Sequence, residues 1–152
     1  MAHFLNRRYL NRQFKNLNDL TRIDLCFNKL ETIDKDTFFG LKKLRLIDLQ
    51  NNEIERVDPQ TFSDVKNLQE IWLSSNRLKV IHKDTFRGLK YLQWIVLYNN
   101  KLQVIDPETF SNLENLQWID LHSNQLHTLV RLVNIVIVNI LVFESKLKNE
   151  KF

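Results

Sequence analysis

The sequence repeats one pattern of residue types every 24 positions, and this period constrains the fold more than any other feature. The clearest copy begins Leu92-Gln-Trp-Ile-Val-Leu-Tyr-Asn-Asn-Lys-Leu102. An asparagine recurs at one phase of every copy, as Asn28, Asn52, Asn76, Asn100 and Asn124. A fixed period with the same residue types at the same phase is typical of a solenoid, in which each repeat stacks on its neighbours. We therefore expect about five stacked coils.

Each repeat contains two aliphatic residues that alternate with other residues, which is the pattern of a short half-buried strand. The pairs are Ile23/Leu25, Ile47/Leu49, Ile71/Leu73, Ile95/Leu97 and Ile119/Leu121. With one strand per coil, the strands must run in the same direction as neighbours in one sheet. The sequence therefore predicts a parallel sheet along one side of the solenoid.

Other phases of the repeat predict the opposite, convex side. A phenylalanine column is expected there, from Phe14, Phe38, Phe62, Phe86 and Phe110. Aspartates before proline (Asp58-Pro59 and Asp106-Pro107), with Asp34 at the same phase, indicate capped short helical turns. Left-handed residues that end these turns are expected at Asn16, Gly40, Asp64, Gly88 and Asn112. The repeated asparagines are expected to be structural, bonding loop backbone groups that lack other partners.

These residues form the pattern L-x-x-L-x-L-x-x-N-x-L, written here as Leu44-Arg-Leu-Ile-Asp-Leu-Gln-Asn-Asn-Glu-Ile54, which resembles the leucine-rich repeat family. The 24-residue length and the phenylalanine column resemble the typical class of animal extracellular repeats, as in Toll-like receptors, Slit-type guidance proteins and leucine-rich proteoglycans. The resemblance covers residues 9–129. It implies a horseshoe whose concave sheet recognises a protein, at the cell surface or outside the cell.

The repeat frame divides the chain into three parts. Residues 1–8 read as a basic N-terminal arm, residues 9–129 as the repeat domain, and residues 130–152 as an apolar and then charged tail. A sixth phenylalanine would fall on Asn134, so the tail breaks the pattern. It reads as a C-terminal cap, as sequence foreign to the fold, or, less favoured because it carries Arg131, Asn134 and Asn139, as a membrane span.

Charge and cysteine content limit the function classes. The net charge is +4, and residues 1–16 carry all of this excess, so the repeats lack the basic stripe that nucleic-acid binding needs. The single cysteine, Cys26, excludes an internal disulfide and a multi-cysteine zinc site. No signal peptide, glycosylation sequon or cysteine-rich cap is visible, although relatives of this class usually carry such caps. These absences favour a reducing compartment or an incomplete chain.

The residues that alternate with the buried strand positions should form an outward-facing candidate site. All three tryptophans fall there, with a tyrosine, a histidine and several acids. The predicted partner-binding residues are Asp24, Asp48, Glu70, Trp72, Trp94, Tyr98, Trp118, Asp120 and His122. Exposed tryptophan and tyrosine clusters are enriched at interface hot spots. The competing interpretation is that these rings only stack and stiffen the sheet.

The sequence gives little support for catalysis. Asp24 and Asp48 are adjacent carboxylates, but they are expected on an open face where Arg22 and Arg45 can neutralise them. Asp120 and His122 share a face without an evident third ligand, so we expect no catalytic residues, no metal and no cofactor. We therefore predict a non-enzymatic module that binds a protein with exposed basic residues through its concave face. The alternative is a fragment of a longer extracellular or membrane receptor with no independent activity.

Overall fold

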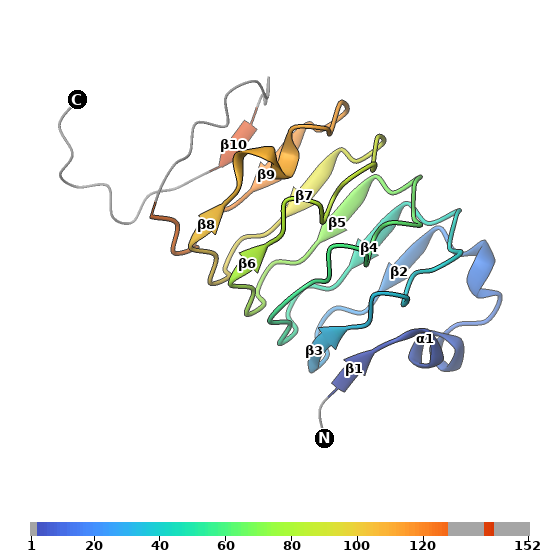
Figure 1. The fold of residues 1–152 in the computed structure, drawn as a ribbon. Coiled ribbons are helices and arrows are strands. Elements are labelled where there is room, and N and C mark those ends of the chain that lie inside the picture. Colours follow the sequence, from blue (N-terminus) through green and yellow to red (C-terminus); the bar gives the residue numbers. More distant parts are fainter. Residues whose placement is uncertain (1–2, 128–138, 142–152) are drawn as a thin grey trace, which may run out of the picture.

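The computed structural model describes residues 3–127 and 139–141. The chain winds in successive coils, and each coil adds one short strand to the same parallel sheet (Figure 1). This main sheet has the strand order β10-β9-β7-β5-β4-β2. Its members are β2 (Arg22–Asp24), β4 (Leu46–Asp48), β5 (Glu70–Trp72), β7 (Trp94–Val96), β9 (Trp118–Asp120) and β10 (Asn139–Leu141). The predicted leucine-rich repeat solenoid with a parallel sheet is confirmed.

The strands pair in the register that the 24-residue period requires. Ile23 lies opposite Ile47, and the same row continues through Ile71, Ile95 and Ile119. All five isoleucine side chains are fully buried. Because alternate strand residues point to opposite sides of a sheet, burial of this row directs its neighbours in the sequence to the outer face.

Phenylalanines fill the core on the side away from the main sheet. Phe38, Phe62, Phe86 and Phe110 form one column of stacked rings, with centroids 5.9, 6.3 and 6.0 Å apart. Phe14 has the same phase but is only partly buried, and it forms the C-cap of a helix instead. The column therefore begins one repeat later than the sequence predicts.

Asparagines close each coil through a ladder of hydrogen bonds. Asn76 Nδ2 donates to the carbonyl oxygens of Leu49, Leu73 and Ser74, and its Oδ1 accepts from Ile54 N. Asn52 and Asn100 repeat this arrangement and are likewise buried. Each amide thus joins two successive coils and satisfies backbone groups that would otherwise be buried without partners.

The N-terminal residues belong to the folded body, which differs from the expected arm. Strand β1 (His3–Leu5) pairs in parallel with β3 (Leu30–Ile33), and α1 (Arg7–Gln13) follows at once, capped by Asn6. Leu5 and Leu10 are fully buried, so these elements cover the first end of the core. The physical reason is that the end of a solenoid exposes apolar side chains until some segment covers them.

Short turns and small strands form the rest of each coil. Only two 3-10 helices occur among the described residues, η1 (Leu17–Asp19) and η2 (Pro107–Phe110), and Asp106 caps the second by accepting from Glu108 N at 2.8 Å. A second two-stranded sheet pairs β6 (Val80–Ile81) with β8 (Val104–Ile105). Within the described part of the chain, no helix is long and apolar enough to cross a membrane.

The left-handed positions are predicted only in part. Asn16, Gly40 and Gly88 have positive φ as expected, but Asp64 and Asn112 do not. Asp64 has another role, because its carboxylate accepts a hydrogen bond from Gly40 N. The regular left-handed position lies instead one residue before each repeated asparagine, at Phe27, Asn51, Ser75, Asn99 and Ser123.

Strand β10 extends the main sheet beyond the last regular repeat. Asn139 to Leu141 pair in parallel with Trp118 to Asp120. The remaining tail, residues 128–138 and 142–152, lies outside the described residues. The interpretations of the tail as a cap, as sequence foreign to the fold or as a membrane span therefore stay predictions.

Candidate functional site

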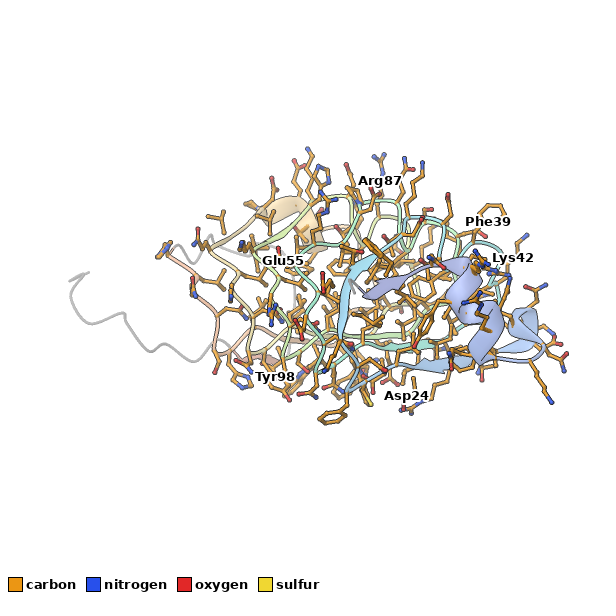
Figure 2. All side chains as sticks on the ribbon, turned by 90° about the horizontal axis from the view of Figure 1, so that it is seen from below. Asp24, Phe39, Lys42, Glu55, Arg87 and Tyr98 are labelled. Carbon is orange, nitrogen blue, oxygen red and sulfur yellow. The ribbon has the colours of Figure 1, made fainter. Side chains whose placement is uncertain are left out.

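The outer face of the main sheet, called here the concave face, consists of three rows of side chains. The strand register aligns the first two rows, and the 24-residue period continues into the third. In order along the sheet, the rows are Arg22, Leu46, Glu70, Trp94, Trp118; Asp24, Asp48, Trp72, Val96, Asp120; and Cys26, Gln50, Ser74, Tyr98, His122. All the sequence-predicted site residues lie on this face. Asp24 and Tyr98 both lie at the lower edge of Figure 2, on the side opposite Phe39 and Arg87.

Aromatic rings gather at the C-terminal half of the concave face. Trp94 and Trp118 stack with centroids 5.6 Å apart, and Tyr98 stacks on His122 with centroids 4.7 Å apart and planes inclined by only 4°. The Trp94 side chain remains 39% exposed, whereas the other three rings are partly buried. Stacking therefore occurs, and it leaves ring surface open to solvent.

Trp72 links this aromatic half to the N-terminal half. The Arg22 guanidinium carbon lies 5.9 Å from the centroid of the Trp72 ring, within the range of a cation–π contact. The Trp72 Nε1 atom is buried and has no hydrogen-bond partner among the described residues. An indole N–H without an acceptor is unusual in a protein, because it loses its bond to water on burial.

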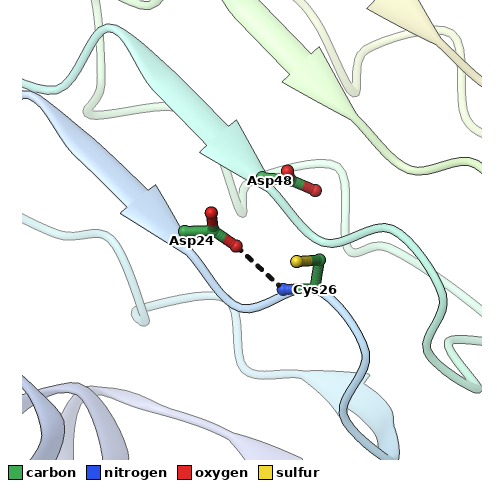
Figure 3. Close-up of side chains that lie close together, drawn as sticks. All are labelled: Asp24, Cys26 and Asp48. Atoms are coloured by element: carbon green, nitrogen blue, oxygen red, sulfur yellow. Dashed lines mark hydrogen bonds between the residues drawn. The ribbon is translucent and has the colours of Figure 1, made fainter.

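The adjacent carboxylates Asp24 and Asp48 lie at the N-terminal end of the face, beside Cys26 (Figure 3). Arg22 Nη2 lies 3.1 Å from Asp24 Oδ2 and 3.9 Å from Asp48 Oδ2, so one guanidinium faces both acids. Arg45 does not join them. Asp48 is only 3% exposed and accepts hydrogen bonds from the backbone and side-chain nitrogens of Gln50. Its carboxylate is thus engaged within the fold.

The ionisation of this corner follows from its charges. Hydrogen bonds from Cys26 and Arg22 lower the pKa of Asp24. The Asp24 carboxylate, partial burial and Asp48 raise the pKa of the Cys26 thiol to about 11, because a thiolate beside carboxylates is repelled. The potential ligand atoms of Asp24, Cys26 and Asp48 lie within 4.8 Å of one another, so these residues could surround a metal ion. A protonated thiol and an Arg22 cation that already faces both acids work against that use.

Asp120 and His122 form a second acidic corner at the C-terminal end. His122 Nδ1 lies 2.5 Å from Asp120 Oδ1, and the same oxygen accepts from His122 N. Asp120 is 9% exposed. The pair holds the imidazole ring flat against Tyr98, which indicates a positioning role for Asp120 on this face.

Two residues of the face were missed by the sequence reasoning. Arg22 was treated only as a neutralising charge, although its guanidinium also lies over the Trp72 ring; its place two coils and two residues away from that ring was the available signal. Phe27 is 79% exposed at the rim, just beyond the third row. Its phase did not mark it as exposed, because Asn51 and Ser75 share that phase and are partly buried.

Comparison with known proteins agrees with this geometry. The sequence model of the family described as leucine rich repeat matches residues 18–78 and 66–126. A solved structure of a leucine-rich repeat protein from Leptospira interrogans superposes with a TM-score of 0.67 at 32% sequence identity, over 74% of this chain. The chain spans 28% of the length of that protein. No curated protein matches the sequence.

The family match extends over more than half of the chain, in the register that the strands and the asparagine ladder define. This chain belongs to the leucine-rich repeat family. The family and its fold serve as protein-interaction modules and are typically non-enzymatic.

Proposed function

We propose that this chain is a non-enzymatic binding module that recognises a protein partner through its concave face. The observation that carries the proposal is the open aromatic cluster of Trp94, Trp118 and Tyr98 on one side of the main sheet. Packing inside the solenoid does not require these rings, because the isoleucine row and the phenylalanine column already fill the core. Large rings with accessible faces bury much area on binding at a small cost in conformational entropy.

The concave face favours a partner that exposes basic side chains. Asp24 keeps a half-exposed carboxylate, and Glu70 lies between the aromatic cluster and the acidic corner in the first row. Lysine or arginine side chains of a partner can stack on the open indole rings and reach these carboxylates. The carboxylates of Asp48 and Asp120 are already bonded to Gln50 and His122. The aromatic rings therefore contribute most of the binding energy, and the acids orient the partner.

We also propose that the repeats belong to the typical 24-residue class of extracellular leucine-rich repeat proteins. The unbroken 24-residue register of the main sheet and the four stacked phenylalanines support this assignment. The expected protein ligand would then meet this face at the cell surface or outside the cell.

The test is affinity purification followed by a direct binding measurement. The wild-type chain and a Trp94→Ser/Trp118→Ser variant are used as baits, partners are identified by mass spectrometry, and each purified partner is titrated by calorimetry. The variant is expected to bind at least about tenfold more weakly, since hot-spot residues commonly contribute more than about 1 kcal/mol each. The matched control is Phe39→Ser/Val104→Ser, which removes two exposed apolar residues away from this face. Equal affinities of the wild type and the tryptophan variant would refute the proposal.

A further inference from the structure

A basic groove lies outside the concave face, on the flank where the chain enters the strands of the main sheet. Its volume is about 360 Å³, and three cationic side chains, Lys42, Lys43 and Arg45, contribute to its lining. Arg45 directly precedes β4 and Gln69 precedes β5, so successive coils build the floor. Figure 2 shows Lys42 on this flank, away from Asp24 and Tyr98.

Most of the positive charge in the groove has no counter-ion. Of these three cations, only Lys43 forms an ion pair with another described residue, Asp19, at 2.7 Å, and both side chains of the pair are largely exposed. Lys42 and Arg45 are exposed and lie in no ion pair of this part of the chain. No acidic residue lines the groove. Cations held together by the fold repel one another, and a bound anion relieves that repulsion.

Neutral groups complete the groove. Asn67 Nδ2 donates to Lys42 O at 2.7 Å, which fixes the backbone between two coils. The Gln69 amide and the exposed Tyr91 ring lie on the same lining. Arginine and tyrosine are among the residue types enriched at protein interfaces, and arginine can bind a carboxylate through two parallel hydrogen bonds.

The extent of the positive charge identifies the class of ligand. Lys42, Lys66 and Lys90 share one phase of the repeat, but the same phase is Asn18 in the first coil and Glu114 in the fifth. The row of cations is therefore limited to three coils, whereas a nucleic acid presents a long regular row of phosphates. We propose that this groove binds a short acidic peptide segment, at a site separate from the concave face.

Fluorescence anisotropy with a short fluorescein-labelled poly-glutamate peptide tests the proposal at physiological ionic strength. The groove variant Lys42→Glu/Arg45→Glu is expected to bind the peptide at least about tenfold more weakly than the wild type. The matched control Lys79→Glu/Lys101→Glu makes the same change in net charge at exposed lysines elsewhere, and it should stay within about twofold. Trp118→Ser changes the concave face and should leave binding of this peptide unchanged. The result therefore tests the groove independently of whether the concave face binds a protein.

Three results would overturn the proposal. One is that the wild-type chain does not bind the poly-glutamate peptide even at millimolar concentrations. The second is equal weakening in the groove and control variants, since this would indicate attraction to the overall charge only. The third is tighter binding of a single-stranded oligothymidylate that the groove variant abolishes, which would assign the groove to nucleic acid. Circular dichroism of each variant confirms that these surface substitutions leave the fold intact.

Discussion

Trp94 and Trp118 stand one repeat apart in the sequence and stack on neighbouring strands, with ring centroids 5.6 Å apart and planes inclined by 25°. The 24-residue period places them in the same row, and the parallel register brings their backbones into direct opposition. A repeat that places the same residue at the same phase thus converts a sequence period into a continuous surface.

The tryptophan pair should stabilise the fold by coupling as well as by burial. In a double-mutant cycle with Trp94→Ser and Trp118→Ser, we expect a coupling energy of about 0.5–1.5 kcal/mol from chemical denaturation. Trp72→Ser combined with Trp118→Ser should be additive within about 0.5 kcal/mol, because β5 and β9 are separated by β7. If the destabilising effects of Trp94→Ser and Trp118→Ser were additive, the two rings would lie beside each other without a stabilising interaction.

Asn76 should be one of the most sensitive polar positions in the chain. Its amide takes part in four hydrogen bonds and is 7% exposed. Asn76→Ala leaves the Ile54 N–H without a partner, whereas the carbonyls of Leu49, Leu73 and Ser74 each keep a second donor, so we expect a loss of about 2 kcal/mol in the free energy of unfolding. The matched control is Asn28→Ala at the exposed start of the ladder, where the loss should be below about 1 kcal/mol. A similar cost at both positions would contradict the role assigned to burial.

Exchange of the turn residues Phe27 and Asn51 should move stability in opposite directions. Both have left-handed backbone, with φ of 55° and 54°, and the Phe27 side chain is 79% exposed. Asparagine tolerates this conformation better than phenylalanine, so Phe27→Asn should raise the free energy of unfolding by up to about 1 kcal/mol. Asn51→Phe should lower it. Thermal and urea denaturation measure both changes, and destabilisation by Phe27→Asn would indicate that the Phe27 ring makes a stabilising contact.

The Cys26 thiol should react slowly with alkylating reagents near neutral pH. Its pKa is raised to about 11, so the reactive thiolate forms only as the pH approaches that value. Asp24→Asn removes the nearest negative charge and lowers the thiol pKa, and we expect alkylation by iodoacetamide at pH 8 to become several-fold faster. The alkylation rate should rise by a smaller factor than the fraction of thiolate, because a less basic thiolate is also a weaker nucleophile. Asp36→Asn, an exposed acid elsewhere, is the control; an unchanged rate in Asp24→Asn would contradict this account.

Much of the fold follows directly from the repeat. The period fixes which isoleucines face inward, and the same alternation places all three tryptophans outward; the structure has both features. The phenylalanine column and the asparagine ladder are equally local consequences of the repeated pattern. Each coil has the same neighbours, so one repeat predicts the next.

The repeat period alone does not predict the structure at the N-terminal end of the solenoid or in its turns. The first eight residues carry no repeat phase, so no pattern in them indicated that Leu5 would lie in the core. Their position depends on the exposed end of the solenoid, which exists only after the coils have stacked. The left-handed position before each repeated asparagine also escaped prediction, because three different residue types occupy it and only the shared turn geometry unites them.

For the concave face, the sequence by itself determined which residues share the surface, because alternation along a strand and the 24-residue period are properties of the chain. Only the tertiary structure decided how those residues interact. It placed Arg22 over Trp72, turned Asp48 toward Gln50 and Asp120 toward His122, and left Trp94 open to solvent. The physical reason is that side-chain pairing depends on rotamers and distances across coils, which stacking sets and a linear pattern does not contain.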